Sequence, residues 1–403
     1  MATDRARRWR SGRWLGWPAM LDHLPPTEAV APNGRGRGAP VARAVAARAS
    51  AAVGDLVRRS RRIAFTLDHE KLVEQRVRHA VPVRQPLVLI SQIQRSGGTL
   101  LSQLFDAHPE LHAHPHELHV GSPSKVNWPE LDLAAGAGAW FETLYERPTG
   151  RAFVEGYNKA ADRSAGAAEA DDILPFLIPP ALQRELFDAA LAQRPAGSQR
   201  DVFDAYMTSY FNAWLDNHNL YLAPKRWVTA FTARLSSHPV SVERFFAAYP
   251  DGRLVSVVRD PRSWWASAKR FREVAPWKVT RQRDYSEVET ALGLWRRSAE
   301  AMLEAADERG SSFRLLRFDA LLADTEGTMR SLADWLGISF HPTLTTPTFN
   351  GLPIKADSSF AVTDHGVRAE PLERFREVLS PEEMAFVEER AMPLYERVAA
   401  LAA

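Results

Sequence analysis

The chain has 403 residues, of which 45% are hydrophobic, so it is long enough to bury one large core or two ordinary ones. Its 12 tryptophans and 19 phenylalanines indicate a globular protein and not a disordered one. The lack of cysteine excludes disulfides, thiolate zinc sites and cysteine nucleophiles, and no apolar run approaches the roughly 18 residues of a membrane span.

Residues 1–80 are predicted to be a basic, partly flexible N-terminal extension. Residues 1–62 contain 13 arginines and four acidic residues, whereas the formal net charge of the whole chain is +2. Their composition is typical of a flexible leader, and an arm for nucleic acid or membrane is the alternative. Residues 63–79 have the periodicity of one amphipathic helix, which leaves residues 81–403 as the folded domain. No cleavage site of a secretory signal is evident, which predicts a cytoplasmic protein.

A glycine-containing loop follows the first predicted strand. Residues 87–92 are apolar enough for a buried strand and residues 99–107 have a helical pattern, so the loop joins a strand to a helix. In an ATP-binding loop of the form G-x-x-x-x-G-K-[ST], the lysine would stand at Gly98. Small residues still let backbone amides approach an anion at the positive end of the helix. The loop therefore predicts an anion site whose cation is Arg95, with an ordinary strand-to-helix turn as the alternative.

The next segment, HPELHAHPHELH at residues 108–119, is rich in histidine. Its spacing differs from the H-E-x-x-H of a zinc helix, and Pro115 interrupts any helix, so no metal is predicted. Histidine titrates near neutral pH, which makes His116 and His119 candidates for a general base.

A second motif begins with the predicted strand at residues 253–258. Strands and helices alternate through the domain, which favours a parallel sheet covered on both faces. Ligands of such sheets bind at the carboxyl ends of the strands, so Arg259 would lie on the same edge as Arg95. Its planar guanidinium could hold a phosphate, and Ser267 in the next helix could donate to the same group. The alternative is that Arg259 pairs with Asp260 or another surface acid and that Ser267 is a neutral helix residue.

The remaining elements are predicted from caps and apolar runs. In chain order they are a helix opened by the capping box Ser286 and Glu289 and ended by Gly310, a strand at 313–318, a helix capped by Asp324 or Thr325 and running through Trp335, and a last helix opened by Ser380, Pro381, Glu382 and Glu383.

Together the two motifs resemble the sulfotransferases that use 3′-phosphoadenosine 5′-phosphosulfate (PAPS). In that family a loop of the form [KR]-x-G-[ST]-T binds the 5′-phosphosulfate, and the matching residues here are Arg95, Ser96, Gly97, Gly98 and Thr99. A later strand ending in arginine, with Asp-Pro-Arg after it and a serine eight residues on, binds the 3′-phosphate, as Arg259 and Ser267 would here. Residues 316–338 are similar to a late strand and helix of the family.

The resemblance implies a three-layer α/β/α fold with a central parallel sheet, similar to P-loop nucleotide hydrolases. It implies PAPS as the co-substrate, no metal, and residues 81–403 as the catalytic domain. Arg95 would stabilise the charge that develops on the leaving phosphate, because a guanidinium cannot act as an acid at neutral pH. Glu117 resembles the family's catalytic base, with His116 and His119 as rivals, and Lys355 resembles a cation over the nucleotide.

The predicted function is transfer of the sulfuryl group of PAPS, by in-line displacement, to a hydroxyl or an amine of a carbohydrate, lipid or small metabolite. The alternatives are a P-loop kinase for small molecules, which lacks its lysine here, and a non-catalytic nucleotide-binding protein of the same fold. No specific nucleic acid partner is predicted. The identity of the acceptor and the oligomeric state do not follow from the sequence.

Overall fold

The computed structural model describes most of the predicted catalytic domain. The described residues are 69–121, 127–157, 173–275, 283–355, 365–368 and 370–402. Most of the predicted basic extension lies outside them, so its flexibility and its partners stay predictions. No helix in these ranges combines the length and the apolar character needed to cross a lipid bilayer.

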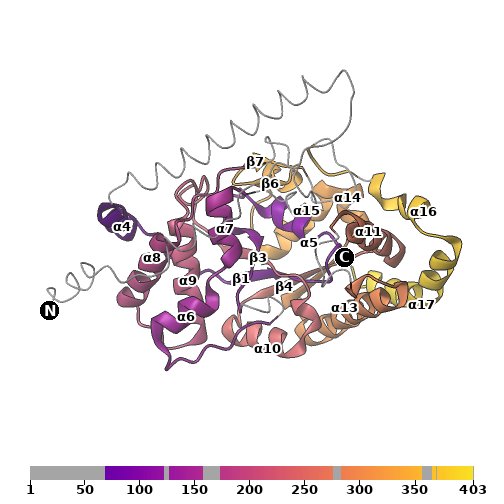
Figure 1. The fold of residues 1–403 in the computed structure, drawn as a ribbon, viewed down its shortest axis with the longest axis horizontal. Helices are drawn as coiled ribbons and strands as arrows, with labels where there is room; N and C mark the ends of the chain where they lie inside the picture. The colour runs from indigo at the N-terminus through magenta and orange to yellow at the C-terminus, as the bar shows by residue number, and fades with distance from the viewer. Residues whose placement is uncertain are drawn as a thin grey trace, which may run out of the picture. The chain divides into compact units, whose positions relative to one another are not determined.

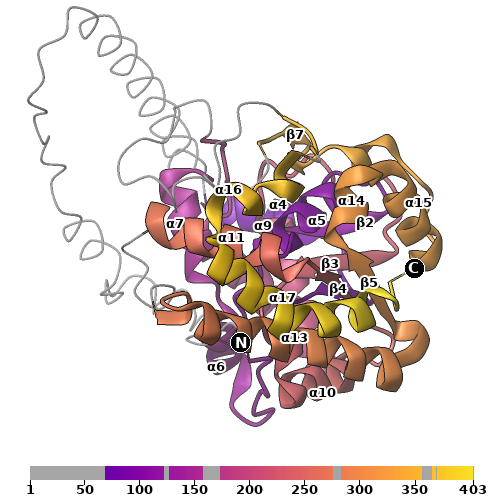
Figure 2. The ribbon, with the colours of Figure 1, turned by 90° about the vertical axis from the view of Figure 1, so that its right-hand side faces the viewer.

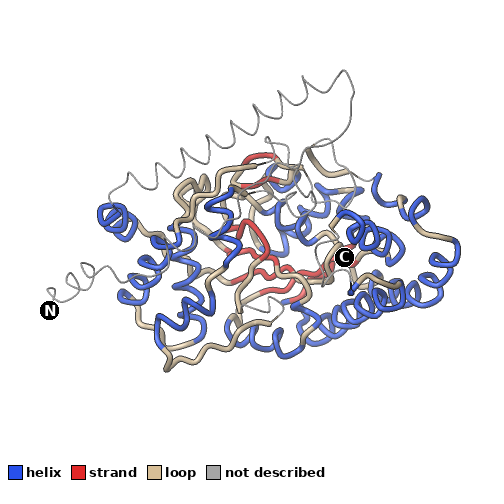
Figure 3. The backbone as a smooth tube through the Cα atoms, in the orientation of Figure 1, coloured by secondary structure: helices blue, strands red, loops and turns tan. Residues whose placement is uncertain are grey.

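A five-stranded parallel sheet lies at the centre of the described residues (Figures 1 and 3). Its strands are β1 (Leu87–Ile90), β2 (Leu111–Glu117), β3 (Trp227–Phe231), β4 (Arg253–Val258) and β5 (Phe313–Arg317). Their order is β2-β3-β1-β4-β5, and every neighbouring pair is parallel. The strands predicted at 87–92, 253–258 and 313–318 correspond to β1, β4 and β5, which confirms those three predictions.

Helices surround this sheet, and a short hairpin of β6 (Thr348–Phe349) and β7 (Leu352–Pro353) adjoins it. The helices of the described residues are α4 (His69–Arg78), α5 (Gly98–Phe105), α6 (Gly136–Leu144), α7 (Arg147–Glu155), α8 (Pro180–Gln193), α9 (Gln199–Ala213), α10 (Pro239–Ala248), α11 (Pro261–Val274), α13 (Val288–Arg309), α14 (Phe318–Ala323), α15 (Thr325–Leu336), α16 (Phe375–Val378) and α17 (Pro381–Ala399).

The side chains of β1 alternate between two hydrophobic cores, one on each face of the sheet. Val88 and Ile90 pack in a core with α5, α14 and α15. Leu87 and Leu89 pack in a core that includes α10, α13 and α17. Figure 2 shows these two groups of helices on opposite sides of the sheet. This arrangement confirms the predicted three-layer α/β/α fold.

Three predicted helix caps are present, among them Gly310 at the end of α13, and one is not. Ser380 forms a capping box at α17, and Asp324 accepts a hydrogen bond from the amide of Gly327 at α15, as predicted. The capping box predicted at Ser286 is wrong, because α13 begins at Val288 and the Ser286 hydroxyl donates to a backbone carbonyl before it. A serine hydroxyl that bonds to a nearby backbone carbonyl is drawn away from capping the helix that follows.

The histidine-rich segment forms strand β2, which the sequence did not predict. Its side chains from Leu111 to Pro115 are buried, and its backbone pairs with β3. β2 is an edge strand, where a proline is tolerated, and the register with β3 shifts between Ala113 and Glu117, on either side of Pro115. Burial of histidines in place of aliphatic residues hides the usual alternation of a strand.

The parallel arrangement brings the two motifs to one edge of the sheet. Arg95 follows β1, Glu117 ends β2, and Arg259 follows β4, so all three lie at carboxyl ends of strands. This edge is where ligands of open α/β sheets bind.

Candidate active site

The loop between β1 and α5 is held in place by its neighbours. Arg95 and Gly97 adopt left-handed backbone conformations, with φ of 69° and 96°. The indole of Trp264 donates a 2.7 Å hydrogen bond to the carbonyl of Gln94, which fixes the loop against α11. The hydroxyl of Ser96 is buried and has no hydrogen-bond partner among the described residues. A strained, anchored loop with an unpaired buried hydroxyl fits an anionic ligand.

Both glycines of the loop are required by close packing. A Cβ atom on Gly97 would lie 2.5 Å from a ring carbon of Phe318, and one on Gly98 would lie 2.3 Å from a ring carbon of Phe231. The ring of Phe318 also stacks under the guanidinium of Arg259, with the Cζ atom 4.5 Å from the ring centroid. The glycines therefore let the loop pack against the rings of Phe231 and Phe318, and the Phe318 ring also contacts Arg259.

We expect Gly97→Ala to lower the free energy of unfolding by roughly 2–6 kcal/mol, because a positive φ and an overpacked contact each cost about 1–3 kcal/mol. Gly293→Ala is the matched control: its Cβ would meet only a guanidinium nitrogen of Arg297 at 3.7 Å, inside helix α13. The control should be neutral or slightly stabilising. Urea unfolding of both variants measures the difference, and equal midpoints for Gly97→Ala and wild type would contradict the strain.

Arg259 is buried at the end of β4 without a carboxylate partner among the described residues. Its guanidinium donates to the hydroxyl of Ser263 at 2.8 and 3.0 Å and to the carbonyl of Arg95 at 2.8 Å. Asp260 pairs with Arg262 at 2.7 Å, so the alternative of an Arg259–Asp260 ion pair does not hold. Burial and the charge of Arg95 lower the pKa of Arg259 to about 9. A buried cation beside a second cation favours the binding of an anion.

Arg95 and Ser267 complete this group. The Nε atom of Arg95 lies 3.4 Å from the Ser267 hydroxyl, and its guanidinium lies over Phe271 of the same helix, 5.1 Å from the ring centroid. Ser267 is buried on α11. The structure therefore gathers Arg95, Ser267 and Arg259, which the sequence placed in two remote motifs, around one point of the sheet edge.

Thr99 and Lys355 are placed less directly. Thr99 is half-buried in the first turn of α5, next to the loop. Lys355 follows the β6–β7 hairpin, which is tied to the far end of α5 by a 2.9 Å hydrogen bond from the amide of Gly351 to Asp106. The residues after Lys355 lie outside the described ranges, so its contact with a nucleotide stays a prediction.

Of the three candidate bases, Glu117 and His119 are the ones that reach solvent. Their side chains are 20% and 30% exposed, and a carboxylate oxygen of Glu117 lies 3.7 Å from Nε2 of His119. The ring of His116 is only 9% exposed, and its Nε2 lies 3.0 and 3.1 Å from the hydroxyls of Thr149 and Tyr210. Burial lowers the pKa of His116 to about 3. These contacts argue against His116 as the base.

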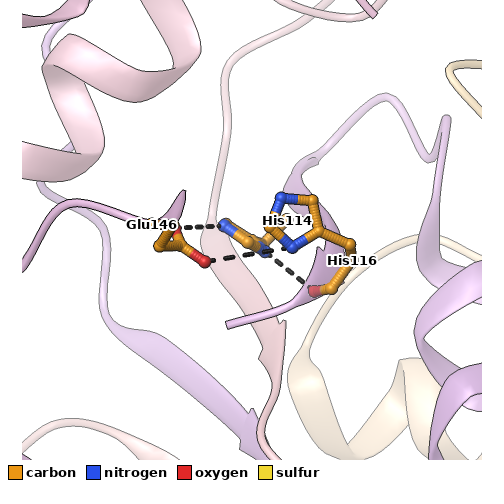
Figure 4. A group of neighbouring side chains, drawn as sticks. All are labelled: His114, His116 and Glu146. Atoms are coloured by element: carbon orange, nitrogen blue, oxygen red, sulfur yellow. Dashed lines mark hydrogen bonds and ion pairs between the residues drawn. The ribbon is translucent and has the colours of Figure 1, made fainter. Parts of the chain in front are cut away.

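Behind Glu117 lies a carboxylate that sequence reasoning missed. Glu146 is fully buried beside His114 and His116, and the three residues offer ligand atoms within 4.8 Å of one another (Figure 4). It is the one group of this kind that could hold a metal ion among the described residues. Glu146 stands far from the histidines in the chain and in no motif, so only the fold reveals the contact.

The buried histidines of β2 should make the protein sensitive to acid. Burial lowers the pKa of His112 to about 3, so below about pH 6.5 the unfolded chain takes up a proton that the folded chain does not. The contribution of His112 to the free energy of unfolding is therefore fully present above about pH 6.5 and is lost as the pH falls towards 3. At pH 5 the loss from this one group is roughly 2 kcal/mol.

We expect His112→Leu to reduce the slope of the free energy of unfolding against pH by the amount that corresponds to about one bound proton, because leucine cannot titrate. The exposed His79→Leu is the matched control and should leave the pH slope unchanged. Urea unfolding at pH 7, 6 and 5 measures the slope. Parallel stability curves for wild type and His112→Leu would contradict the assignment.

Comparisons with known proteins bear on this site. A model described as the sulfotransferase family matches residues 86–342. No curated protein sequence matches the chain. Solved structures similar to it include the sulfotransferase domain of the Synechococcus PCC 7002 olefin synthase, with 15% identity over 78% of this chain and 96% of that one and a TM-score of 0.40.

Two further structures are similar at the same level. The sulfotransferase domain of the curacin biosynthetic pathway has 15% identity over 76% of this chain and 98% of that one, with a TM-score of 0.41. A sulfotransferase from Alicyclobacillus acidocaldarius has 15% identity over 79% and 95%, with a TM-score of 0.37.

Proposed function

Because this chain belongs to the sulfotransferase family, we propose that it transfers the sulfuryl group of PAPS to a hydroxyl or an amine of a carbohydrate, lipid or small metabolite. The observation that carries the proposal is the buried Arg259, which has no carboxylate partner among the described residues and lies against the loop that contains the unpaired Ser96 hydroxyl. Cation, hydroxyl and helix N-terminus together fit a ligand with two anionic ends.

The two motifs would divide the donor between them. Arg259 and Ser267 would bind the 3′-phosphate, and Ser96, Thr99 and the amides at Gly97 and Gly98 would bind the 5′ side. Lys355 would add a further cation over the nucleotide. PAPS, when bound, supplies an activated sulfuryl group whose departure leaves a phosphate.

The chain's own groups would then act on charge and on a proton. Arg95 would stabilise negative charge on the bridging oxygen more strongly in the transition state than in the ground state. Glu117 would accept the proton of the acceptor hydroxyl, with His119 beside it. β3 separates β2 from β1, so the backbone of Glu117 stands about 10 Å from the end of β1 at Ile90, at about 4.8 Å per strand. That spacing leaves room for an acceptor in line with the donor.

Several finer predictions belong to the same proposal. Residues 81–403 would form the catalytic domain, the protein would be cytoplasmic, and transfer would need no metal. The kinase alternative would need a lysine in the loop, where Gly98 stands and a side chain would meet Phe231.

Calorimetry without magnesium tests the donor, using adenosine 3′,5′-bisphosphate (PAP) and ATP as ligands. Selective binding of PAP supports the proposal, and magnesium-dependent binding of ATP would favour a kinase. Sulfur-labelled PAPS with a fixed pool of sugars, phenols, long-chain alcohols and sterols then tests transfer. Binding of PAP with no label transferred would leave a non-catalytic nucleotide-binding protein.

A further inference from the structure

The carboxyl end of β2 is held from within the protein by a buried polar cluster. Its centre is Glu146, which precedes α7 at the N-cap position but makes no side-chain hydrogen bond to that helix. The carboxylate is fully buried and turns instead towards β2 (Figure 4). The cluster comprises His114, His116, Glu146, Thr149, Tyr206 and Tyr210.

Glu146 binds the chain on both sides of Glu117. One carboxylate oxygen accepts hydrogen bonds from Nε2 of His114 at 3.0 Å and from the hydroxyl of Tyr206 at 3.1 Å. The other accepts a 2.8 Å hydrogen bond from the backbone amide of His119. Glu117 lies between these two attachment points, so the chain on both sides of it is tied to one buried carboxylate.

A metal ion at this cluster is the other reading, and the hydrogen bonds argue against it. Nδ1 of His114 lies 2.9 Å from the carbonyl of His116, and Nδ1 of His116 lies 2.8 Å from the carbonyl of Glu117. A carbonyl only accepts, so both Nδ1 atoms carry hydrogen and offer no lone pair. Nε2 of His116 is taken by two hydroxyls. The hydrogen bond between Nε2 of His114 and the Glu146 carboxylate completes the cluster, in which no buried side-chain atom lacks a partner.

The charge of Glu146 is consistent with that account. Burial alone raises the pKa of its carboxyl group, but electrostatic attraction and the hydrogen bond from His114, together with His116 and the amide of His119, outweigh burial and bring the pKa to about 2. Glu146 is therefore an ionised group that needs its donors from β2, because an unpaired buried charge is costly.

We propose that Glu146 is a positioning residue, which fixes the carboxyl end of β2 so that Glu117 faces the acceptor at the sheet edge. The inference rests on the proposed function, since it assigns Glu117 a reacting proton. Glu146 itself touches neither donor nor acceptor. Glu146 therefore affects the rate of transfer only by setting the position of Glu117.

The test is Glu146→Gln, which keeps the shape of the side chain and removes its charge. We expect kcat for transfer from labelled PAPS to the fixed pool to fall roughly 10- to 100-fold, the effect of a small misplacement of a reacting group. Affinity for PAP should stay within about twofold, because the loop and Arg259 are untouched. In a Glu117→Gln background the same change should have almost no further effect on kcat.

Three outcomes would overturn the inference alone while wild type remains active: an unchanged kcat, a loss of PAP affinity as large as the loss of kcat, or a full effect in the Glu117→Gln background. One zinc ion per wild-type chain that is lost in Glu146→Gln would also overturn it, in favour of a metal site. Wild type that transfers no label ends the proposed function and the inference with it.

Tyr206→Phe serves where Glu146→Gln does not fold, because it removes only one hydrogen bond to the carboxylate. It should lower kcat in the same direction by a smaller factor, with PAP affinity unchanged, and an unchanged kcat would contradict the proposal. Tyr249→Phe is the matched control: Tyr249 is equally buried but packs against Trp128, Phe203 and Phe245 instead of β2. Its kcat should equal that of wild type.

Discussion

Arg259→Ala is expected to weaken the binding of PAP by at least about 30-fold. Removing one partner of a buried charge pair costs about 2–5 kcal/mol, and each 1.4 kcal/mol corresponds to about tenfold in affinity. Phe318 and Ser263 already hold the Arg259 side chain in place, so it loses little conformational freedom when a phosphate binds. Calorimetry with PAP measures the change directly.

Arg262→Ala is the matched control for this substitution. It removes an arginine three residues further on, in the first turn of α11, which pairs with Asp260 and Glu388. Its affinity for PAP should match wild type. Adenosine 5′-monophosphate is a second control, because a ligand without the 3′-phosphate should bind Arg259→Ala and wild type alike. Unchanged affinity of Arg259→Ala for PAP would refute the 3′-phosphate assignment.

Arg95→Gly is expected to lower kcat by roughly 10²–10³-fold, the usual effect of removing one group that stabilises charge in the transition state. Glycine is the informative replacement because Arg95 has a φ of 69°, which glycine adopts without strain. The free energy of unfolding should therefore change by no more than about 1 kcal/mol. A loss of activity in this variant then reports the missing guanidinium and not a damaged loop.

Arg95→Ala and Arg95→Lys complete the series. Arg95→Ala should lose as much kcat as Arg95→Gly but be less stable than it, because the Cβ atom of alanine keeps the backbone strain. Arg95→Lys should recover part of kcat because it keeps the charge. Labelled PAPS with the fixed acceptor pool gives kcat, and PAP calorimetry gives affinity. A loss of PAP affinity with kcat intact would mean that Arg95 binds the donor and does nothing further.

Much of the local structure around the candidate site could be predicted from local sequence. β4 begins and ends where its apolar run does, and the two glycines after β1 mark the loop in the sequence. Both signals depend only on residues near one another in the chain. The family match over residues 86–342 confirms the resemblance that these motifs suggested.

The remainder depends on contacts that no local pattern records. β2 was missed because its buried positions carry histidines, whose hydrogen bonds come from α7 and α9. Glu146 meets His114 across 32 positions, so its role exists only in the folded chain. Sequence alone also could not decide whether Arg259 pairs with Asp260, and the structure shows Asp260 paired with Arg262 instead.

The adjacency of two like charges at the sheet edge links folding to the supply of donor. Burial and, after it, repulsion from Arg95 lower the pKa of Arg259, so without an anion the paired cations weaken the native state. A nucleotide that binds only folded molecules raises their share by mass action, by about 2.7 kcal/mol at 100 times its dissociation constant. If PAPS is the donor, as proposed, a shortage of PAPS would therefore leave more of the protein unfolded and open to proteases, and its abundance would fall with that of the nucleotide.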